Sequence, residues 1–274
     1  MFRKILIANR GEIAVRIIRA ARELGIATVA VYSTADKEAL HTLLADEAIC
    51  IGPAKSTDSY LNMNAVLSAA VLTEAEAIHP GFGFLSENSK FATMCEEVGV
   101  KFIGPSGAIM DMMGDKINAR AQMIKANVPV IPGSDGEVFT AEEALEVAEK
   151  IGYPVMLKAS AGGGGKGIRK VEKAEDLVAA FESASSEAKA AFGNGAMYME
   201  RVIYPARHIE VQILADQHGH VVHLGERDCS LQRNNQKVLE EAPSVAIGKT
   251  LRQKIGDAAV RAAQSVGYEN AGTI

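Results

Sequence analysis

The sequence predicts an α/β protein of more than one domain: a parallel-sheet domain, a smaller α+β domain and the start of a third. Over the first hundred residues, short apolar runs alternate with patterns of helical period, which is typical of a parallel sheet with crossover helices. From about residue 139 the order changes to helix, strand, loop, strand, helix and strand. The chain has 274 residues, more than the roughly 150 of a common single domain.

The parallel-sheet domain is expected over residues 1–113. Ile13, Ile17 and Leu24 share one face of a predicted helix that ends at Gly25, because glycine readily adopts the left-handed conformation that closes helices. Two further helices are expected, at 59–74 and around 90–98. The expected strands are residues 4–8, 27–32, 47–52, 75–80 and 100–104.

A helical connector is expected over residues 114–131, and the α+β domain over residues 132–203. Thr140 and Glu143 have the spacing of a capping box at a helix start. The start of an incomplete third domain is expected over residues 204–274. It should contain an antiparallel hairpin with a turn at 217–219, then a polar loop and a helix at about 247–266. The strands expected in the α+β domain are residues 153–160, 168–171 and 196–203.

The composition excludes several classes of protein. The net charge is −5 and the pI about 5.8, whereas proteins that bind nucleic acid or anionic membranes non-specifically need a positive field. Cys50, Cys95 and Cys229 are far apart, so neither a disulfide framework nor a structural zinc site is expected. No apolar run reaches the ~18 residues of a membrane span, and the first residues do not resemble a signal peptide. We therefore expect a cytoplasmic protein with no nucleic-acid or membrane partner.

A glycine-rich loop, GGGGKG at 162–167, lies between two predicted strands. A dinucleotide-binding loop would need a helix after it. A Walker loop would need glycine at Ser160 and Ser or Thr at Gly167. Two interpretations stay open: a hairpin lid that folds over phosphates, with charge from Lys158 and Lys166, or a solvated surface hairpin.

Six segments together closely resemble the biotin carboxylase component of biotin-dependent carboxylases, in the ATP-grasp superfamily. The resemblance covers essentially the whole chain. It implies a pre-ATP-grasp N-terminal domain, an ATP-grasp lid and a third domain that completes the site. It also implies a reaction in which ATP and bicarbonate give carboxyphosphate, which carboxylates biotin on a carrier protein. The segments are 5–26, 77–88, 102–106, 114–116, 158–167 and 226–244.

The resemblance implies an ATP site built from several segments. Lys116 and Lys158 resemble two phosphate-binding lysines, although an exposed lysine is the commoner fate of this residue type. Glu200 resembles the acceptor of the adenine amino group, where an ordinary strand end is the plain alternative. The other residues implied at this site are Gly164 and Gly165 at the phosphates, Arg201, Val202 and Ile203 at the adenine, and His208, Gln232 and Asn235 near the ribose or phosphates.

The same resemblance implies roles in the chemistry and assembly. Lys237 resembles the lysine that holds bicarbonate and is the expected catalytic residue, although its segment also reads as a solvated turn. Phe82 and Gly83 resemble the wall on which biotin packs. Arg19 and Glu23 match positions on the family's dimer face, where an exposed i,i+4 pair is the alternative.

Two positions depart from the family's pattern. Asn235 stands where many members have histidine, so phosphate charge there must be balanced by other groups. Phe82 stands where tyrosine is common, which keeps the stacking face and loses the hydroxyl.

Family members continue beyond the end of this sequence. The resemblance implies that the metal carboxylates, the catalytic base and two arginines lie past Ile274, and that no metal ligand lies within the chain. It implies ATP with Mg²⁺ or Mn²⁺, carrier-bound biotin, a biotin carboxyl carrier protein, carboxyltransferase subunits and a homodimer. The expected acceptor is acetyl-CoA, in fatty acid synthesis, while propionyl-CoA and pyruvate carboxylases share this component.

Two other functions stay open. The chain could be a non-catalytic nucleotide-binding or subunit-interaction module. It could also be another ATP-grasp ligase, which would not explain the segments 79–88 and 232–237. A third domain cut short is further expected to expose the apolar side chains of Val211, Ile213 and Leu214.

Overall fold

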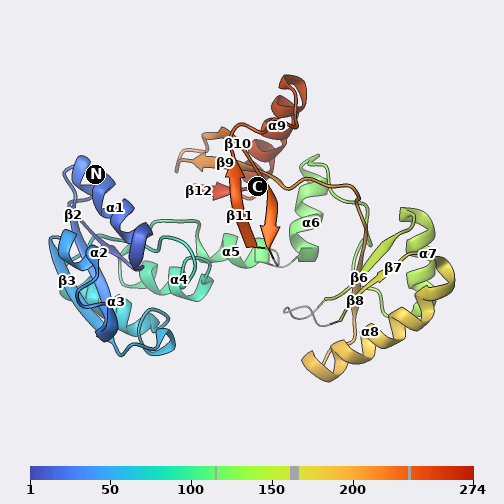
Figure 1. Cartoon of the computed structure of the whole chain (residues 1–274), viewed down its shortest axis with the longest axis horizontal. Coiled ribbons are helices and arrows are strands. Elements are labelled where there is room, and N and C mark those ends of the chain that lie inside the picture. Colours follow the sequence, from blue (N-terminus) through green and yellow to red (C-terminus); the bar gives the residue numbers. More distant parts are fainter. Residues whose placement is uncertain (115, 161–166, 234–235) are drawn as a thin grey trace. The chain divides into compact units, whose positions relative to one another are not determined.

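The computed structural model describes residues 1–114, 116–160, 167–233 and 236–274, with Lys116 described by its backbone alone. The predicted α/β class, with a parallel sheet followed by antiparallel sheets, is confirmed (Figure 1). The chain divides into two compact units. One contains Met1–Gly114, Val211–Leu224 and Ala263–Ile274 and the other contains Asp115–Glu210 and Gly225–Ala262.

The N-terminal sheet has five parallel strands in the order β3-β2-β1-β4-β5. Because the chain leaves β1 toward β2 and returns beside it at β4, the carboxyl end of the β1–β4 pair is a topological switch point. Such points are where open α/β sheets place ligands. The strands are β1 (Lys4–Ile7), β2 (Ala27–Ser33), β3 (Glu47–Gly52), β4 (Ala77–His79) and β5 (Lys101–Phe102).

Both faces of this sheet are covered, as a parallel sheet requires. Leu6 points into one buried cluster, whereas Ile5 and Ile7 point into the other, following the two-residue period of a strand. The helix after β1 packs on the second cluster and is followed by Gly25, whose φ is +71°. The helices are α1 (Gly11–Glu23), α2 (Leu40–Leu44), α3 (Met63–Leu72), α4 (Ser89–Glu97) and α5 (Gly107–Gly114).

The segment after residue 115 contains a three-stranded antiparallel sheet in the order β7-β6-β8. Val155, Leu157 and Met199 on one face pack with two helices in a buried cluster. The predicted capping box of Thr140 and Glu143 is confirmed at the start of α7. The elements are α6 (Lys116–Lys125), α7 (Ala141–Ile151), β6 (Val155–Ala159), β7 (Ile168–Val171), α8 (Leu177–Phe192) and β8 (Met197–Arg201).

A four-stranded sheet follows in the order β11-β10-β9-β12. The predicted turn at 217–219 is confirmed, but residues expected in a polar loop form β11, which pairs antiparallel with β10. The long β10–β11 hairpin is orange in Figure 1. The elements are β9 (Ile209–Ala215), β10 (Val221–Arg233), β11 (Gln236–Glu241), α9 (Lys249–Ser265) and β12 (Asn270–Thr273).

The expected exposure of three apolar residues on β9 is wrong for two of them. Val211 is 2% exposed and Ile213 is 1% exposed, whereas Leu214 is 45% exposed. Adjacent residues of a strand point to opposite faces, so Leu214 cannot share a face with Ile213. Only one face of β9 is therefore open at Leu214.

Among the described residues, no helix combines the length and apolar character that crossing a membrane would require.

Candidate active site

Lys158 and Glu200 lie side by side on the open face of the β7-β6-β8 sheet. Lys158 is opposite Tyr198 and Glu200 is opposite Met156, so the two are diagonal neighbours across the β6–β8 pair. The Lys158 ammonium forms an ion pair with the Glu200 carboxylate. Their side chains are 33% and 23% exposed, so the pair is accessible to a ligand while being partly shielded from water.

The strand that carries Glu200 leads into the predicted adenine-binding hinge. The Arg201 N–H donates to the Pro132 carbonyl, and the Val202 N–H donates to the Pro154 carbonyl, each at 2.8 Å. These bonds fix the backbone and leave the carbonyls of Arg201 and Val202, with the backbone of Ile203, as groups able to meet a base edge. The backbone N–H groups of Arg201 and Val202 are therefore already hydrogen-bonded within the protein.

Several predicted phosphate contacts lie outside the described residues. These are Gly164, Gly165 and Asn235, and the side chain of Lys116 is likewise outside, although its backbone begins α6. The flanking strands are described: β6 and β7 pair antiparallel through Lys158 and Ile168. The predicted strand after the glycine-rich segment is therefore confirmed, which excludes the helix of a dinucleotide fingerprint.

Lys237 on β11 belongs to a compact group of charged side chains. Glu210 on β9 is 6% exposed. Its Oε2 contacts the Lys237 ammonium, and its Oε1 accepts from Arg227 Nε at 2.6 Å and Nη2 at 2.5 Å. Arg227 Nε also lies 3.5 Å from Oε2 of Glu240. Two carboxylates and two cations therefore balance, and Glu210 holds Lys237 in place.

This arrangement sets the charge states. The hydrogen bond to Glu210 raises the pKa of Lys237 and outweighs the effect of burial, so the ammonium stays protonated at neutral pH. Burial alone would raise the pKa of Glu210, but the hydrogen bonds from Lys237 and Arg227 lower it overall. Lys237 is consequently a fixed positive charge rather than a base, and at 37% side-chain exposure it can receive a small anion.

Glu210, Cys229 and Glu240 bring possible metal-ligand atoms within 4.8 Å of one another. Arg227 and Lys237 already pair with the carboxylates. Burial raises the pKa of the Cys229 thiol, and Mg²⁺ prefers oxygen ligands. The cluster therefore does not fit magnesium.

Two further predicted residues, His208 and Gln232, form hydrogen bonds with Cys229 or Ser230 on β10. The His208 N–H donates to Ser230 Oγ at 3.0 Å, and its carbonyl accepts from the Cys229 N–H at 2.8 Å, while its side chain is exposed. Gln232 is opposite Lys237 across β10 and β11, and its amide donates to the Cys229 carbonyl at 2.9 Å. Gln232 thus lies beside Lys237.

Phe82 and Gly83 lie on the turn after β4, at the switch point of the N-terminal sheet. Phe82 is 61% exposed, and Gly83 has φ +65° with no atom within 4 Å of where a Cβ would be. The turn therefore presents an aromatic side chain beside an open backbone surface, which suits a flat ligand.

Arg19 and Glu23 are both exposed on α1. Among the ion pairs found in the described part of the chain, none joins them, so the alternative of a surface pair is not formed. They line a surface groove of about 810 Å³ that also includes Glu12 and Arg16.

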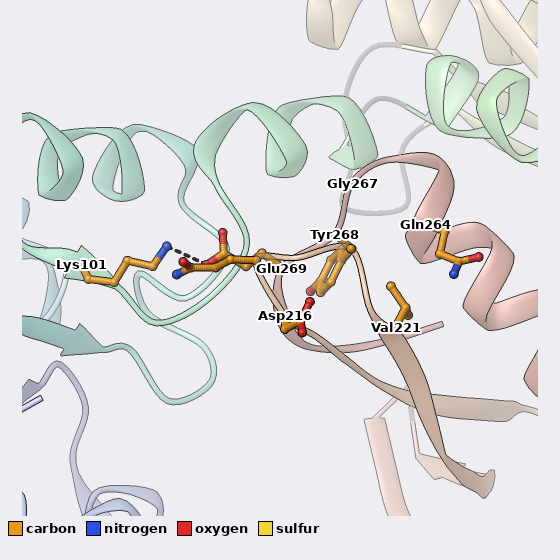
Figure 2. Close-up of a pocket in the computed structure, with 9 residues that line it drawn as sticks. Lys101, Asp216, Val221, Gln264, Gly267, Tyr268 and Glu269 are labelled. Carbon is orange, nitrogen blue, oxygen red and sulfur yellow. Dashed lines mark hydrogen bonds and ion pairs between the residues drawn. The ribbon is translucent and has the colours of Figure 1, made fainter. Parts of the chain in front are cut away.

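A separate pocket of about 700 Å³ lies between the β9–β10 turn and the turn after α9 (Figure 2). Lys101 and Glu269 pair at 2.8 Å at one side of it, and Tyr268 and Asp216 face it from the two turns. Its lining includes no residue that the sequence assigned to a site.

Sequence reasoning missed Glu210, Arg227 and Asn9. The segment 208–214 alternates polar and apolar residues, so Glu210 reads as an outward-facing strand residue. Its partners are 17 and 27 positions away, and no local pattern links them. Asn9 lies within the resembling segment 5–26, yet nothing in the sequence shows which carbonyls its amide binds.

Comparison with family models and with known proteins finds matches that cover nearly the whole chain. Residues 1–110 match the family described as "Biotin carboxylase, N-terminal domain", and residues 115–274 match "Carbamoyl-phosphate synthase L chain, ATP binding domain". Biotin carboxylase 1 of Bacillus subtilis (strain 168) is 57% identical over the whole chain. The chain spans 61% of the length of that relative.

Solved structures show the same likeness. A biotin carboxylase–β-γ-ATP complex from Campylobacter jejuni matches with a TM-score of 0.89 at 53% identity, covering 100% of this chain and 61% of that one. The biotin carboxylase domain dimer of Hydrogenobacter thermophilus 2-oxoglutarate carboxylase, bound to MgADP, ADP and bicarbonate, matches with a TM-score of 0.86 at 51% identity, covering 100% and 60%. The chain belongs to the biotin carboxylase family, with an ATP-grasp fold.

Proposed function

We propose that the protein carboxylates biotin on a carrier protein, using ATP and bicarbonate through carboxyphosphate. The observation that carries this proposal is the ammonium of Lys237, held by the buried carboxylate of Glu210 at an accessible position. A permanent cation attracts bicarbonate and stabilises the negative charge that develops as its oxygen attacks the γ-phosphorus. Bicarbonate is a poor electrophile, and its phosphorylation creates the leaving group that carboxyl transfer needs.

ATP binding is proposed at the open face of β6 and β8. Lys158 would pair with a phosphate, and Glu200 would accept from the adenine amino group. Both side chains come from neighbouring strands of one small sheet, so they have a fixed spacing. Lys116, Gly164, Gly165, His208, Gln232 and Asn235 complete this proposal on the strength of the family resemblance.

Biotin is proposed to pack against Phe82 and Gly83, where an exposed ring lies beside open glycine backbone. Arg19 and Glu23 are proposed at a dimer face. The Hydrogenobacter relative is a dimer in complex with MgADP, and Mg²⁺ is proposed to accompany ATP here.

Acetyl-CoA is the proposed final acceptor, with a separate carrier protein and carboxyltransferase as partners. The proposed location is the cytoplasm. The four domain limits, 1–113, 114–131, 132–203 and 204–274, are proposed as the working division of the chain.

The test is ADP release with Mg-ATP, bicarbonate and free biotin, measured on the whole protein and on the 274-residue chain. Lys237→Ala should lower bicarbonate-dependent turnover about 100-fold, the usual effect of removing one group that stabilises developing charge. Lys254→Ala, on the exposed side of α9, is the matched lysine control and should retain activity.

A whole protein without bicarbonate- and biotin-dependent turnover would refute the enzyme and favour the nucleotide-binding module. Equal activity of the Lys237→Ala and Lys254→Ala variants would refute the role of Lys237.

A further inference from the structure

A buried asparagine holds the turn that carries Phe82. Asn9 lies in the short connection between β1 and α1 and is only 4% exposed. Its Nδ2 donates to the Pro80 carbonyl at 2.8 Å and to the Phe82 carbonyl at 2.7 Å. Its Oδ1 accepts from the Arg10 N–H at 2.9 Å. Both amide hydrogens and the amide oxygen are therefore used, and two of the three bonds fix the turn after β4.

Gly81 shows how closely the turn lies on this amide. It has φ +65°, and a Cβ there would lie 2.8 Å from Asn9 Nδ2 and 3.1 Å from Asn9 Cγ. A real Cβ does not approach side-chain atoms so closely, so the turn or Asn9 would have to move. The backbone on either side of Gly81 can reach Asn9 only because residue 81 has no side chain.

The far end of the turn is held by aromatic stacking. The Phe84 and Tyr60 rings stack with centroids 5.0 Å apart and planes 13° from parallel. The Arg10 guanidinium lies 5.1 Å from the Tyr60 ring and 5.6 Å from the Phe84 ring. Tyr60 is 1% exposed, and its hydroxyl donates to Asp36 at 2.7 Å. Phe84 is thus fixed against a buried, hydrogen-bonded ring.

Phe82 lies between these two attachments. It is 61% exposed, while Asn9 and Tyr60, on which the two attachments rest, are buried. It also lies at the carboxyl end of the β1–β4 pair, where the strand order reverses. The rigid support and the exposed ring indicate a surface prepared for a ligand.

We propose that Asn9 is a positioning residue that holds Phe82 for the bicyclic ring of biotin and so determines the affinity for biotin. Asn9 acts through the Phe82 backbone and does not itself touch the reacting atoms. This role rests on the proposed function, because it assumes that biotin packs on Phe82.

The first test is Asn9→Asp in the whole protein, with initial rates measured against biotin and against ATP. The carboxylate has the shape of the amide but cannot donate to the two carbonyls, which it would repel. The KM for biotin should rise about tenfold or more, as expected for the loss of buried hydrogen bonds. The kcat and the KM for ATP should stay within about twofold, because Lys158, Glu200 and Lys237 belong to the other compact unit.

The second test keeps Asn9 and displaces the turn. Gly81→Ala should also raise the KM for biotin, since its Cβ would collide with the Asn9 amide. Gly99→Ala is the matched control: its φ is +74°, and no atom lies within 4 Å of the added Cβ. It therefore carries the same backbone strain without the collision, and its KM for biotin should equal that of the wild type.

The outcomes separate this role from the proposed function. A wild-type protein without biotin-dependent turnover would overturn both. A wild-type protein that turns over biotin, with an unchanged biotin KM in Asn9→Asp and Gly81→Ala, would overturn the positioning role alone. If Asn9→Asp shows no cooperative thermal unfolding, the positioning role is decided by comparing the KM for biotin of Gly81→Ala with that of Gly99→Ala. If kcat of Asn9→Asp falls equally whether biotin or ATP is varied, and the KM for biotin does not change, the role of Asn9 is merely structural and the proposal is overturned.

Discussion

Single buried carboxylates organise the charges of the candidate active site. Glu210 binds Arg227 through one oxygen and Lys237 through the other. Glu226, which is 5% exposed, likewise accepts from Arg252 Nε at 2.7 Å and from the Ser244 N–H at 3.1 Å. Each buried charge thus has a cation and hydrogen bonds that offset its loss of hydration.

Glu210→Gln should destabilise the protein by about 3 kcal/mol at pH 7, because it leaves two cations without their shared carboxylate. Because the pKa of Glu210 is lowered in the folded protein, its contribution to the free energy of unfolding is complete above its ordinary pKa of 4.5. That contribution is lost as the pH falls through the folded value. Urea midpoints at pH 7 and pH 3.5 should therefore differ less in the variant than in the wild type.

The raised pKa of Lys237 has the opposite effect on the pH dependence of stability. The contribution of Lys237 to the free energy of unfolding is complete below its ordinary pKa of 10.5 and is lost as the pH rises through the folded value. Glu97→Gln, an exposed carboxylate on α4, is the matched control and should behave as the wild type at every pH. An acid sensitivity of Glu210→Gln equal to that of the wild type would contradict the assignment.

Individual site residues could be predicted from the sequence where they lie in a recognisable segment, and not where they lie alone. Lys158 and Lys237 were found because their segments resemble a family. Glu210 was not, because its pairing depends on the register of β10 and β11, which contains irregularities near Leu231. Such register shifts leave no sequence period from which to infer a contact.

Among the elements, those with a strong local signal were predicted well. The parallel strands, the capping box of α7 and the hairpin turn at 217–219 are confirmed. Other elements were missed because tertiary pairing creates them. β12, with the sequence NAGT, is held by its pairing with β9, and β5 is shorter than predicted, covering only Lys101–Phe102.

The capping box of α7 gives a prediction at this scale. Thr140 Oγ1 accepts from the Glu143 N–H at 3.2 Å, and Glu143 accepts from the Phe139 N–H at 2.9 Å. Thr140→Ala should cost about 1 kcal/mol and speed hydrogen exchange in the first turn of α7. Thr57→Ala, whose exposed hydroxyl contacts only its neighbour Asp58 among the described residues, should leave exchange unchanged. Equal exchange in both variants would show that α7 does not depend on its cap.

At the scale of the whole molecule, the third sheet leaves apolar side chains in contact with water. Leu231 and Leu239 are cross-strand partners and are 59% and 56% exposed. Val222 and Leu224 on β10 are also more than half exposed. The sequence predicted exposed apolar side chains on β9, where only Leu214 of the three named residues is exposed; it did not predict β11.

The 274-residue chain should therefore have a lower urea midpoint than the whole protein and should self-associate more. Sedimentation velocity and urea unfolding of both forms measure this directly. Leu231→Lys with Leu239→Glu should reduce self-association of the chain, since opposite charges replace an apolar pair. Equal midpoints in the two forms, or unchanged association in the double variant, would contradict the prediction.

The ion pair between Lys158 and Glu200 makes the proposed nucleotide site favour ligands that engage both side chains at once. Each charge already has a partner, so a ligand that engages only one of them leaves the other unpaired. Pyrophosphate alone would take Lys158 from Glu200, and adenosine alone would take Glu200 from Lys158, at a cost in each case. A molecule that carries both an amino-purine and a phosphate chain replaces both partners at once. Selectivity for the intact nucleotide over its fragments would thus arise from two side chains that satisfy each other when the site is empty.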